Sequence, residues 1–279
     1  MAHPMAAQLQ GKVAIVTGAG RGIGRGIALV LAERGASVTV SDINAEAAAD
    51  AAEEIGAAGG HAIAVAADVT SQDSMNEVAK RALNEFSQID ICVANAGVLG
   101  APGHQDRMDY TDADWDSTYD VNVKGLVHMA DAVIPHMKER RYGKIVNIAS
   151  HAGRAPRGAS SIAGTIQATY SVSKAAAIQW THVLAINLGQ YNINVNAVCP
   201  GTIWTPMWET IALNRKAHNP GLADLSPKEI FDLSIRERMP LGRAQTPEDI
   251  GKAVAFLSSD DASEITGQAL NVNGGAIMS

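Results

Sequence analysis

The sequence predicts a doubly wound α/β fold, in which one parallel sheet of about seven strands is covered by helices on both faces. Short runs rich in Val and Ile alternate with longer helical patterns along the whole chain. These runs are continuously apolar, which is typical of strands buried on both faces. The 279 residues suit one large domain, and no repeat, linker or charge block divides them. We therefore expect a single domain over residues 1–279.

The elements follow one another in strand–helix order. The first helical pattern stops at Gly35, a residue typical of the end of a helix. The expected strands are 12–18, 37–42, 61–69, 90–97, 143–150, 193–201 and 268–275. The expected helices are 22–34, 45–58, 73–86, 114–137, 170–188 and 247–259.

Two segments depart from this alternation. Residues 151–167 are rich in Gly, Ser and Ala, and residues 205–239 hold short helical patterns interrupted by Pro206, Pro220 and Pro227. Both follow a predicted strand, and ligands of doubly wound proteins bind beyond the carboxyl ends of the strands. We expect the first segment to form a pocket wall, and a substrate lid to span about residues 203–240.

Composition and charge exclude several classes of function. The chain has 22 basic and 29 acidic residues, a net charge of −7, which argues against nucleic acid or an anionic membrane as the main partner. No apolar run has the length of a signal-peptide core or a membrane span. Cys92 and Cys199 lie in strand-like runs, so we expect no disulfide, and the eight histidines show no metal-ligand spacing. We expect a cytoplasmic protein without a metal site.

The turn after the first strand carries Gly18, Gly22 and Gly24 in the pattern G-x-x-x-G-x-G. The related pattern G-x-G-x-x-G does not fit, because Ile23 stands where it needs a glycine. Glycines here permit a close approach of the backbone, and the following helix directs free N–H groups and its positive end at a pyrophosphate. Steric packing alone also explains glycines in a turn, but their number and place favour a nucleotide-binding loop that includes Arg21 and Ile23.

Asp42 ends the second strand. A carboxylate at this place accepts hydrogen bonds from both ribose hydroxyls of an adenosine and repels a 2′-phosphate, so we expect NAD in preference to NADP. Two observations leave room for another interpretation. Asp42 also stands where it can cap the next helix, and Arg21 is a basic group able to meet a 2′-phosphate.

Two further strand ends belong to the expected cofactor site. Asp68 and Val69 end the third strand and are placed to flank the adenine, although Asp68 is equally suited to cap the next helix. Asn95, Ala96 and Gly97 end the fourth strand, where small residues let a cofactor pass close to the backbone.

Tyr170 and Lys174 stand four residues apart in a helical pattern, so their side chains project from the same face. With this pair added to the motifs above, the chain resembles the short-chain dehydrogenase/reductase family, in its single-domain branch with a Rossmann-type fold. The resemblance covers Lys12 to Gly275. Its motifs, in order, are TGxxxGxG, Asp42, Asp68-Val69, NAG at 95–97, Asn122-Val123, IVNIAS ending at Ser150, Tyr170-x-x-x-Lys174 and CPGTIWTPM from Cys199.

The resemblance implies an active site of four residues: Ser150, Tyr170, Lys174 and Asn122. In the family the serine usually stands closer to the tyrosine than the 20 residues that separate Ser150 from Tyr170, and Ser160 and Ser161 are nearer in the sequence. Ser150 remains the expected residue because it ends an apolar strand, and lengthening a surface loop costs little free energy.

The chemistry expected of these residues is hydride transfer between a secondary alcohol and NAD. Tyr170 is the expected general base for oxidation and general acid for reduction. We expect Lys174 and an oxidised nicotinamide to lower the pKa of the phenol, whose ordinary value is about 10. Ser150 is expected to bind the substrate oxygen, and Tyr170 and Lys174 to contact the cofactor as well. Asn122 is expected to hold a water between Lys174 and solvent, unless it is only an amide bonded to backbone.

The motif that starts at Cys199 supplies the remaining expected contacts. Those expected to pack on the nicotinamide are Pro200, Gly201, Ile203 and Thr205. Candidate substrate residues, each of which packing alone would also explain, are His151, Trp204, Met207 and Trp208. The motif is similar to those of acetoin/diacetyl reductases and polyol dehydrogenases of the family, so the expected substrate is a small diol, hydroxyketone or polyol. The resemblance also implies a homotetramer formed through the helices that bear Asn122 and Tyr170.

Two alternative functions remain open. The first is an NADP-dependent 3-oxoacyl thioester reductase of the same family, against which Asp42 and the lack of an evident basic patch for a phosphopantetheine arm both argue. The second is a non-catalytic dinucleotide-binding regulator, which has no need of the Ser150, Tyr170 and Lys174 set. An enoyl reductase is expected to space its tyrosine and lysine more widely.

Overall fold

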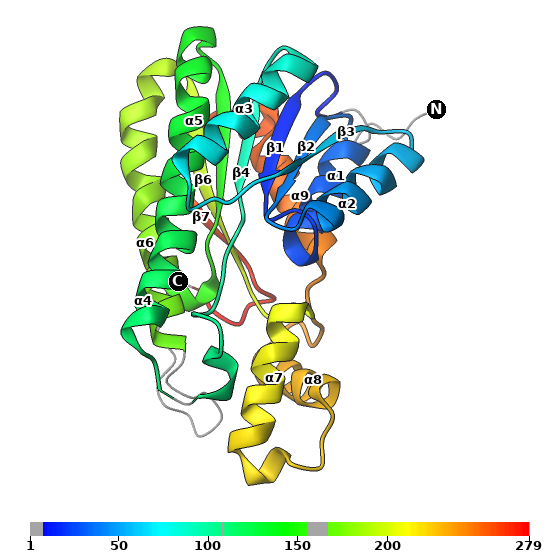
Figure 1. The fold of residues 1–279 in the computed structure, drawn as a ribbon, viewed down its shortest axis with the longest axis vertical. Helices are drawn as coiled ribbons and strands as arrows, with labels where there is room; N and C mark the ends of the chain where they lie inside the picture. Colours follow the sequence, from blue (N-terminus) through cyan, green and yellow to red (C-terminus); the bar gives the residue numbers. More distant parts are fainter. Residues whose placement is uncertain (1–7, 108, 156–166, 279) are drawn as a thin grey trace.

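The computed structural model describes residues 8–107, 109–155 and 167–278, and one sheet runs through its centre (Figure 1). In this part of the chain seven parallel strands lie in the order β3-β2-β1-β4-β5-β6-β7. The chain builds outward from β1 to β3 and then returns to add β4 on the other side of β1, as a doubly wound sheet requires. The strands are β1 (Val13–Thr17), β2 (Ser37–Asp42), β3 (His61–Ala66), β4 (Ile91–Ala94), β5 (Gly143–Ile148), β6 (Ile193–Pro200) and β7 (Ala269–Val272).

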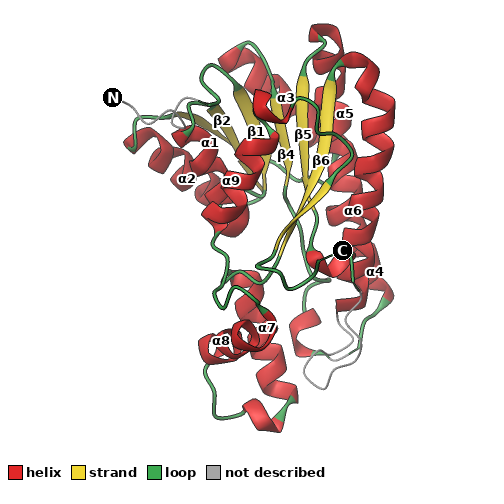
Figure 2. Ribbon diagram, turned by 180° about the vertical axis from the view of Figure 1, so that it is seen from behind, coloured by secondary structure: helices red, strands yellow, loops and turns green. Residues whose placement is uncertain are grey.

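Helices cover both faces of this sheet (Figure 2). One face carries α1 (Gly22–Glu33), α2 (Ala45–Ala57) and α9 (Pro247–Leu257). The other carries α3 (Gln72–Phe86), α5 (Gly125–Arg140) and α6 (Gln167–Leu188). The predicted fold class is therefore confirmed.

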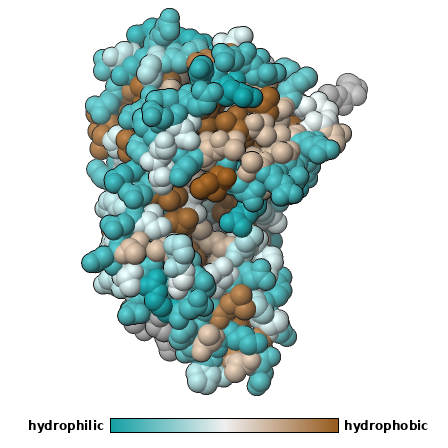
Figure 3. Space-filling view, viewed as in Figure 1, coloured by the Kyte–Doolittle hydropathy of each residue, from teal (hydrophilic) through white to brown (hydrophobic). Residues whose placement is uncertain are grey.

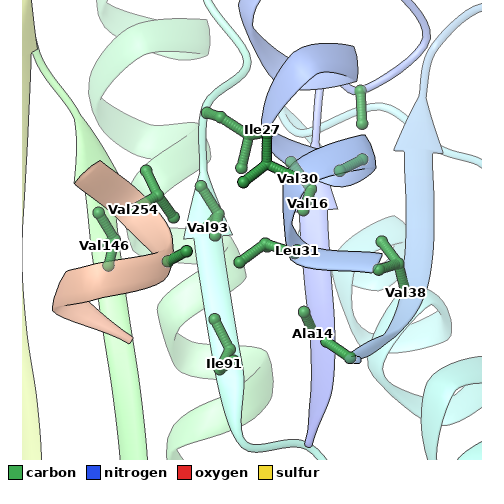
Figure 4. Packing of buried hydrophobic residues seen from close by; sticks show 14 of the residues in the cluster. Ala14, Val16, Ile27, Val30, Leu31, Val38, Ile91, Val93, Val146 and Val254 are labelled. Atoms are coloured by element: carbon green, nitrogen blue, oxygen red, sulfur yellow. The ribbon is translucent and has the colours of Figure 1, made fainter. Parts of the chain in front are cut away.

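The core lies between the sheet and these helices. Figure 4 shows Ile27 and Leu31 of α1 packed with Val16 and Val93 of the neighbouring strands, and all four side chains are fully buried. Burying one such side chain contributes about 1.5–3 kcal/mol relative to leaving it in water. Because the apolar layers on both faces hold the strands in register, the carboxyl ends of the strands form a fixed edge.

The helix expected over residues 114–137 is interrupted in the structure. α4 (Asp112–Tyr119) leads into a π-helical turn, Asp120–Lys124, and only then does α5 begin. Single π turns inside helices are rare and occur often at functional sites. This one carries Asn122, a predicted site residue.

Two helices, α7 (Pro206–His218) and α8 (Pro227–Arg238), lie beyond the carboxyl ends of the strands (Figure 1). Each begins with a proline, a residue suited to the first helical position, where no N–H is needed. The prolines that interrupt the sequence pattern therefore start helices. Residues 203–240, the segment predicted to act as a lid, contain an apolar cluster around Phe231 and Ile235.

Gly24→Ala is expected to destabilise the fold by about 3 kcal/mol, because overpacking at a rigid backbone contact is costly. A Cβ on Gly24 would overlap the Gly18 carbonyl oxygen and Asn95 Nδ2. Thermal or urea unfolding measures the change. Gly56→Ala is the matched control: Gly56 lies in α2 with nothing within 4 Å of an added Cβ. Its better helix propensity is expected to raise stability by about 0.5–1 kcal/mol. Equal effects of the two substitutions would contradict the steric argument.

Candidate active site

The turn between β1 and α1 folds as its glycines predict. Gly18 and Gly22 have φ angles of 62° and 57°, left-handed values that favour glycine. Arg21, which precedes α1, makes no side-chain cap hydrogen bond, so its side chain does not occupy the N–H groups at the start of the helix. The turn presents backbone N–H groups and a helix N-terminus, the arrangement that binds phosphate groups.

Asn95 fixes this turn to the end of β4. Its Nδ2 donates to the carbonyl oxygens of Thr17 and Gly18 at 2.9 and 3.0 Å, and its own N–H donates to Thr17 Oγ1 at 3.1 Å. A Cβ on Gly18 would lie 2.8 Å from Ala96 Cα, so the two strand ends meet along their backbones. The segment from Asn95 to Gly97 therefore lines the edge between β1 and β4, where the strand order reverses.

Asp42 lies at the end of β2, against the glycine loop. Its Oδ2 accepts from Gly20 N at 2.9 Å and its Oδ1 from Asn44 N at 3.0 Å. Helix α2 is capped instead by Asn44, whose side chain accepts from Ala47 N, so the cap role for Asp42 is wrong. Each carboxylate oxygen keeps capacity for a further donor, as ribose recognition requires. Arg21 is exposed in the same loop.

Asp68 does not cap a helix either. Ser71 caps α3, while Asp68 Oδ1 accepts from the N–H and the hydroxyl of Thr70 at 2.9 and 2.8 Å. The neighbouring Val69 packs under the first residue of α5, and its carbonyl oxygen lies 2.9 Å from Nδ1 of His128. Asp68 and Val69 are thus held at the end of β3 by local turns and by α5.

Ile43 is a residue at this edge that the sequence alone does not single out. It directly follows Asp42, and 74% of its surface is exposed. An exposed large apolar side chain beside a strand end is suited to contact a flat apolar ring. Ile43 stands out only through its exposure in the folded protein, and this exposure cannot be read from the sequence.

Asn122 makes three hydrogen bonds inside the protein. Its Oδ1 accepts from Val98 N at 2.8 Å, and its Nδ2 donates to Val98 O and to Ser173 Oγ, both at 2.9 Å. The side chain is fully buried. It therefore joins the segment after β4 to helix α6, which is closer to the backbone-bonded role than to the predicted water site.

Ser150, Tyr170 and Lys174 come together at the end of β5. Ser150 follows this strand, is only 7% exposed, and hydrogen-bonds with the Tyr170 side chain. Lys174 Nζ donates to the Ile148 carbonyl at 2.8 Å and lies 5.7 Å from the centre of the Tyr170 ring. A Cβ on Gly97 would lie 3.4 Å from this Nζ, so the end of β4 adjoins the same group.

The alternative serines, Ser160 and Ser161, lie outside the described residues, as does most of the predicted pocket wall over residues 151–167.

The pKa values of the pair differ from the expectation. Burial raises the pKa of Tyr170 above 10.0, and its hydrogen bond with Ser150 offsets part of this rise. Burial lowers the pKa of Lys174 from 10.5 to about 8. Without a bound nicotinamide the pKa of the phenol is therefore raised, because burial has the largest effect and Lys174 is not among the groups that shift it. At pH 7 the phenol is neutral and the lysine is charged.

The segment after β6 adjoins both the glycine loop and the lid. A Cβ on Gly201 would overlap Gln245 Oε1, so this position after Pro200 needs a glycine. Ile203 is 3% exposed and forms a backbone bridge with Gln245. Thr205 caps α7 by accepting from Trp208 N, and its Cγ2 would lie 3.5 Å from a Cβ on Gly22. The start of α7 thus lies beside the turn between β1 and α1.

The predicted substrate residues separate into two groups. Trp204 and Trp208 pack edge to face on Phe231, with ring centres 5.2 and 4.9 Å apart, so they serve the core of the lid. His151 is buried, at 6% exposure, whereas Met207 in the first turn of α7 is half-buried. Figure 3 shows apolar surface gathered near the middle of one face, between the part that holds the sheet and the part formed by α7 and α8.

Cys199 is a further neighbour of the cluster. Its buried thiol hydrogen-bonds with the Arg154 side chain and the Ser150 backbone, and burial raises its pKa, so the thiol stays neutral. The other cysteine, Cys92, is also buried and free.

In residues 8–107, 109–155 and 167–278, no three His, Cys, Asp or Glu side chains form a group able to hold a metal ion. Over the same ranges, none of the helices combines the length and the apolar character that crossing a membrane would require.

Several known proteins are similar to this chain in sequence and in fold. A family model described as enoyl-(acyl carrier protein) reductase matches residues 18–276. The 3-oxoacyl-[acyl-carrier-protein] reductase FabG of Thermotoga maritima is 35% identical over 272 residues, which are 97% of this chain and 100% of that protein. A solved 7α-hydroxysteroid dehydrogenase with NADH and 7-oxo glycochenodeoxycholic acid is 35% identical, with a TM-score of 0.82 over 100% of this chain and 99% of its own. An NAD⁺-bound xylitol dehydrogenase is 34% identical, with a TM-score of 0.85 over 96% of this chain and 100% of its own.

The chain belongs to the short-chain dehydrogenase/reductase family. It is an oxidoreductase that acts on the hydroxyl or keto group of a small molecule with NAD(P). The predicted family and enzyme class are confirmed. The family model is named for an enoyl reductase, whereas the three relatives are named for hydroxyl or keto substrates.

Lys174→Met is expected to raise the stability of the protein. Lowering the pKa of Lys174 from 10.5 to about 8 corresponds to a cost of ~3 kcal/mol for the buried charge. Losing the hydrogen bond to Ile148 offsets about 1 kcal/mol of the gain, so we expect about 2 kcal/mol at pH 7.

The pH dependence of this gain has a definite sign. The folded protein binds its proton more weakly than the unfolded chain, so the cost is full below pH 8 and is lost as the pH rises from about 8 to 10.5. Urea unfolding at pH 7 and at pH 10 checks both points. A variant less stable than the parent, or equally stabilised at both pH values, would contradict the cost assigned to this charge.

Proposed function

We propose that this enzyme interconverts a secondary alcohol and a ketone with NAD as its preferred cofactor, and that Tyr170 is the general acid and base. One observation carries the proposal. Ser150, Tyr170 and Lys174 meet at the carboxyl edge of the sheet, beside a glycine loop backed by Asp42. The proton donor Tyr170, the cation Lys174 and the glycine loop that would bind a dinucleotide therefore lie next to one another.

The residues of the edge fit a dinucleotide. The close approach at Gly18 and Gly24 leaves no room for side chains, so only backbone N–H groups face a pyrophosphate there. Asp42 is placed to accept from the ribose hydroxyls of the adenosine, and the exposed Ile43 to contact the adenine. Gly201 and Thr205, at the other end of the edge, adjoin the nicotinamide half.

Asn95, Ala96 and Gly97 line the path between the two halves of the cofactor, and Asp68 and Val69 close it on the adenine side. Lys174 also reaches the nicotinamide ribose with the N–H groups that Ile148 does not accept. These contacts leave the substrate oxygen facing Ser150 and Tyr170.

Proton transfer follows from the state of the two side chains. When bound, an oxidised nicotinamide accepts the hydride and adds a positive charge that favours the phenolate form of Tyr170. In reduction the neutral Tyr170 donates its proton to the carbonyl oxygen, while Ser150 holds that oxygen by a hydrogen bond. In oxidation Tyr170 must first lose its proton. Since burial raises its pKa, we expect oxidation to be faster at alkaline pH and reduction near neutrality.

The substrate class we propose is a small diol, hydroxyketone or polyol. The polyol dehydrogenase among the relatives supports this class. The rival class is a 3-oxoacyl thioester with NADP, which the similarity to FabG and the exposed Arg21 favour. Asp42 argues against the rival, since its carboxylate lies where a 2′-phosphate would be repelled. A screen of diols, polyols, hydroxysteroids, hydroxyacids and 3-oxoacyl thioesters with both cofactors separates the classes.

We further propose a homotetramer that forms through α5 and α6. Three apolar residues of α6 are exposed along one side of the helix: Val172 at 44%, Val183 at 38% and Ile186 at 82%. Their spacing of 11 and 3 residues keeps them on one stripe, as a contact between subunits requires.

Tyr170→Phe is expected to lower kcat by about 100- to 10,000-fold, because it removes the proton donor and acceptor while keeping the ring. The affinity for NAD is expected to stay within about two-fold, because the ring and Lys174 still line the same edge. Absorbance of the reduced nicotinamide measures turnover, and fluorescence titration measures binding. Retention of most of the turnover would remove Tyr170 from the mechanism.

Asp42→Ala is expected to weaken NAD binding by about 10- to 100-fold, because charge-assisted hydrogen bonds to the ribose are lost. Binding of NADP is expected to change much less, or to improve, so the ratio of the two affinities falls. Asp68→Ala is the control, since the adenine is common to both cofactors and their ratio should not change. An unchanged ratio in Asp42→Ala would refute the ribose assignment.

A further inference from the structure

The lid joins the rest of the described chain through few contacts. Its helices α7 and α8 pack mainly on each other, around Ala212 and Ile230 and around Phe231, where Ala244 and Ala276 from outside the lid also pack. The chain enters the lid at Thr205 and leaves it after Met239. Apart from these two connections, α7 contacts the segment that contains His104 and Asp106, in the loop after β4. The lid is therefore a small body whose orientation depends on contacts at its margins.

The loop after β4 is a rigid platform built on Asp114. Asp114 Oδ1 accepts from Ala101 N at 2.9 Å, and Oδ2 accepts from Thr111 N at 2.8 Å. Arg107 donates to both oxygens, at 3.0 and 3.1 Å. Burial opposes the charge of Asp114, but these hydrogen bonds hold its pKa at about 2. The carboxylate thus stays charged at neutral pH and holds residues 101–107 and 109–111 of the loop together.

Asn214 connects the lid to this platform. It lies on α7, two turns after the proline that starts the helix, and its Nδ2 donates to Gln105 O at 2.6 Å and to Arg107 O at 3.1 Å. Both amide protons of Asn214, on the lid, are therefore donated to the loop after β4, which is distant from the lid in the sequence. The platform begins just after Gly97, which adjoins Lys174 and Asn122. The bonds of Asn214 tie the far end of α7 to the strand end that carries the chemistry.

We propose that Asn214 is a latch: a positioning residue that holds the lid closed over bound substrate and must release for substrate entry and product exit. The two ends of α7 are fixed differently. Its start is anchored by the chain itself, with Thr205 beside Gly22, whereas its other end is held by the two hydrogen bonds of Asn214. Breaking those bonds frees the far end to swing and leaves the cofactor loop unchanged.

The chemistry of the latch predicts which substitutions break it. The acceptors are two main-chain carbonyl oxygens, so the group on the lid must be a double donor. Asn214→Ala removes the donor. Asn214→Asp places a carboxylate against two carbonyl oxygens and is expected to open the lid further. Thr210→Ala is the matched control, because Thr210 lies one turn earlier on α7 and, among the residues that the structure describes, its hydroxyl bonds only to Pro206 O of its own helix.

The test measures lid motion and kinetics on the full chain. Two lost hydrogen bonds between neutral groups are expected to speed amide hydrogen exchange over residues 206–238 about ten-fold in Asn214→Ala, and more in Asn214→Asp. The KM of the alcohol is expected to rise about ten-fold while the KM of NAD and the melting temperature stay near the parent values. Thr210→Ala is expected to match the parent protein in every measurement.

Two results would overturn the latch: exchange and alcohol KM in both Asn214 variants equal to those of Thr210→Ala, or equal increases in the KM of alcohol and of NAD. The kinetic part rests on the proposed function, but the exchange measurement does not. If the parent protein oxidises none of the screened alcohols, the proposed function fails, while the rate of exchange in the lid still decides whether Asn214 holds it.

Discussion

The buried ammonium of Lys174 is the constraint around which this site is arranged. Its hydrogen bond to the Ile148 carbonyl joins α6 to the end of β5, and this carbonyl is free to accept because the parallel strand ends there. Desolvation makes the charge costly, as the lowered pKa shows. The proposed proton transfer gives this charge, which α6 keeps beside the Tyr170 ring, a use beyond its bond to Ile148. The neighbouring bonds of Asn122 to Val98 and Ser173 fix the same stretch of α6 to the segment after β4.

These contacts make the edge of the sheet rigid before any ligand binds. Both faces of β1, β4 and β5 are packed, so the ends of these strands cannot move apart without opening the core. The glycines also make this edge rigid, because Gly18 and Gly24 let the loop lie directly on the end of β4, where Asn95 bonds to it. Rigid donors and acceptors require little reorganisation during the reaction. The site therefore depends on backbone contacts as much as on its four named side chains.

Much of this edge could be predicted from the sequence, for a definite reason. The motifs stand at strand ends, and in a parallel sheet all carboxyl ends meet at one edge, so local patterns imply a shared place. What could not be predicted depends on contacts between distant residues. Burial reverses the expected shift in the pKa of Tyr170, and the partners of Asn122 lie 24 and 51 positions away. The π turn that carries Asn122 and the platform on Asp114 show no local pattern, and the exposure of Ile43 appears only in the folded chain.

The separation of the sheet edge from the lid also bears on which part of the enzyme selects the substrate. At 34–35% identity the relatives are named for an acyl thioester, a steroid and a sugar alcohol, yet two of them superpose on this chain with TM-scores above 0.8. Substrates so different in size and polarity are not selected by a common fold alone. In this chain the parts that flank the edge of the sheet without belonging to the sheet are the lid and the loop after β4. Both are held by side chains rather than by the sheet, so they can change without disturbing the chemistry. If α7 closes on the platform of Asp114 as proposed, the choice of substrate lies in that contact, and the cluster of Tyr170 and Lys174 determines only which reaction the substrate undergoes.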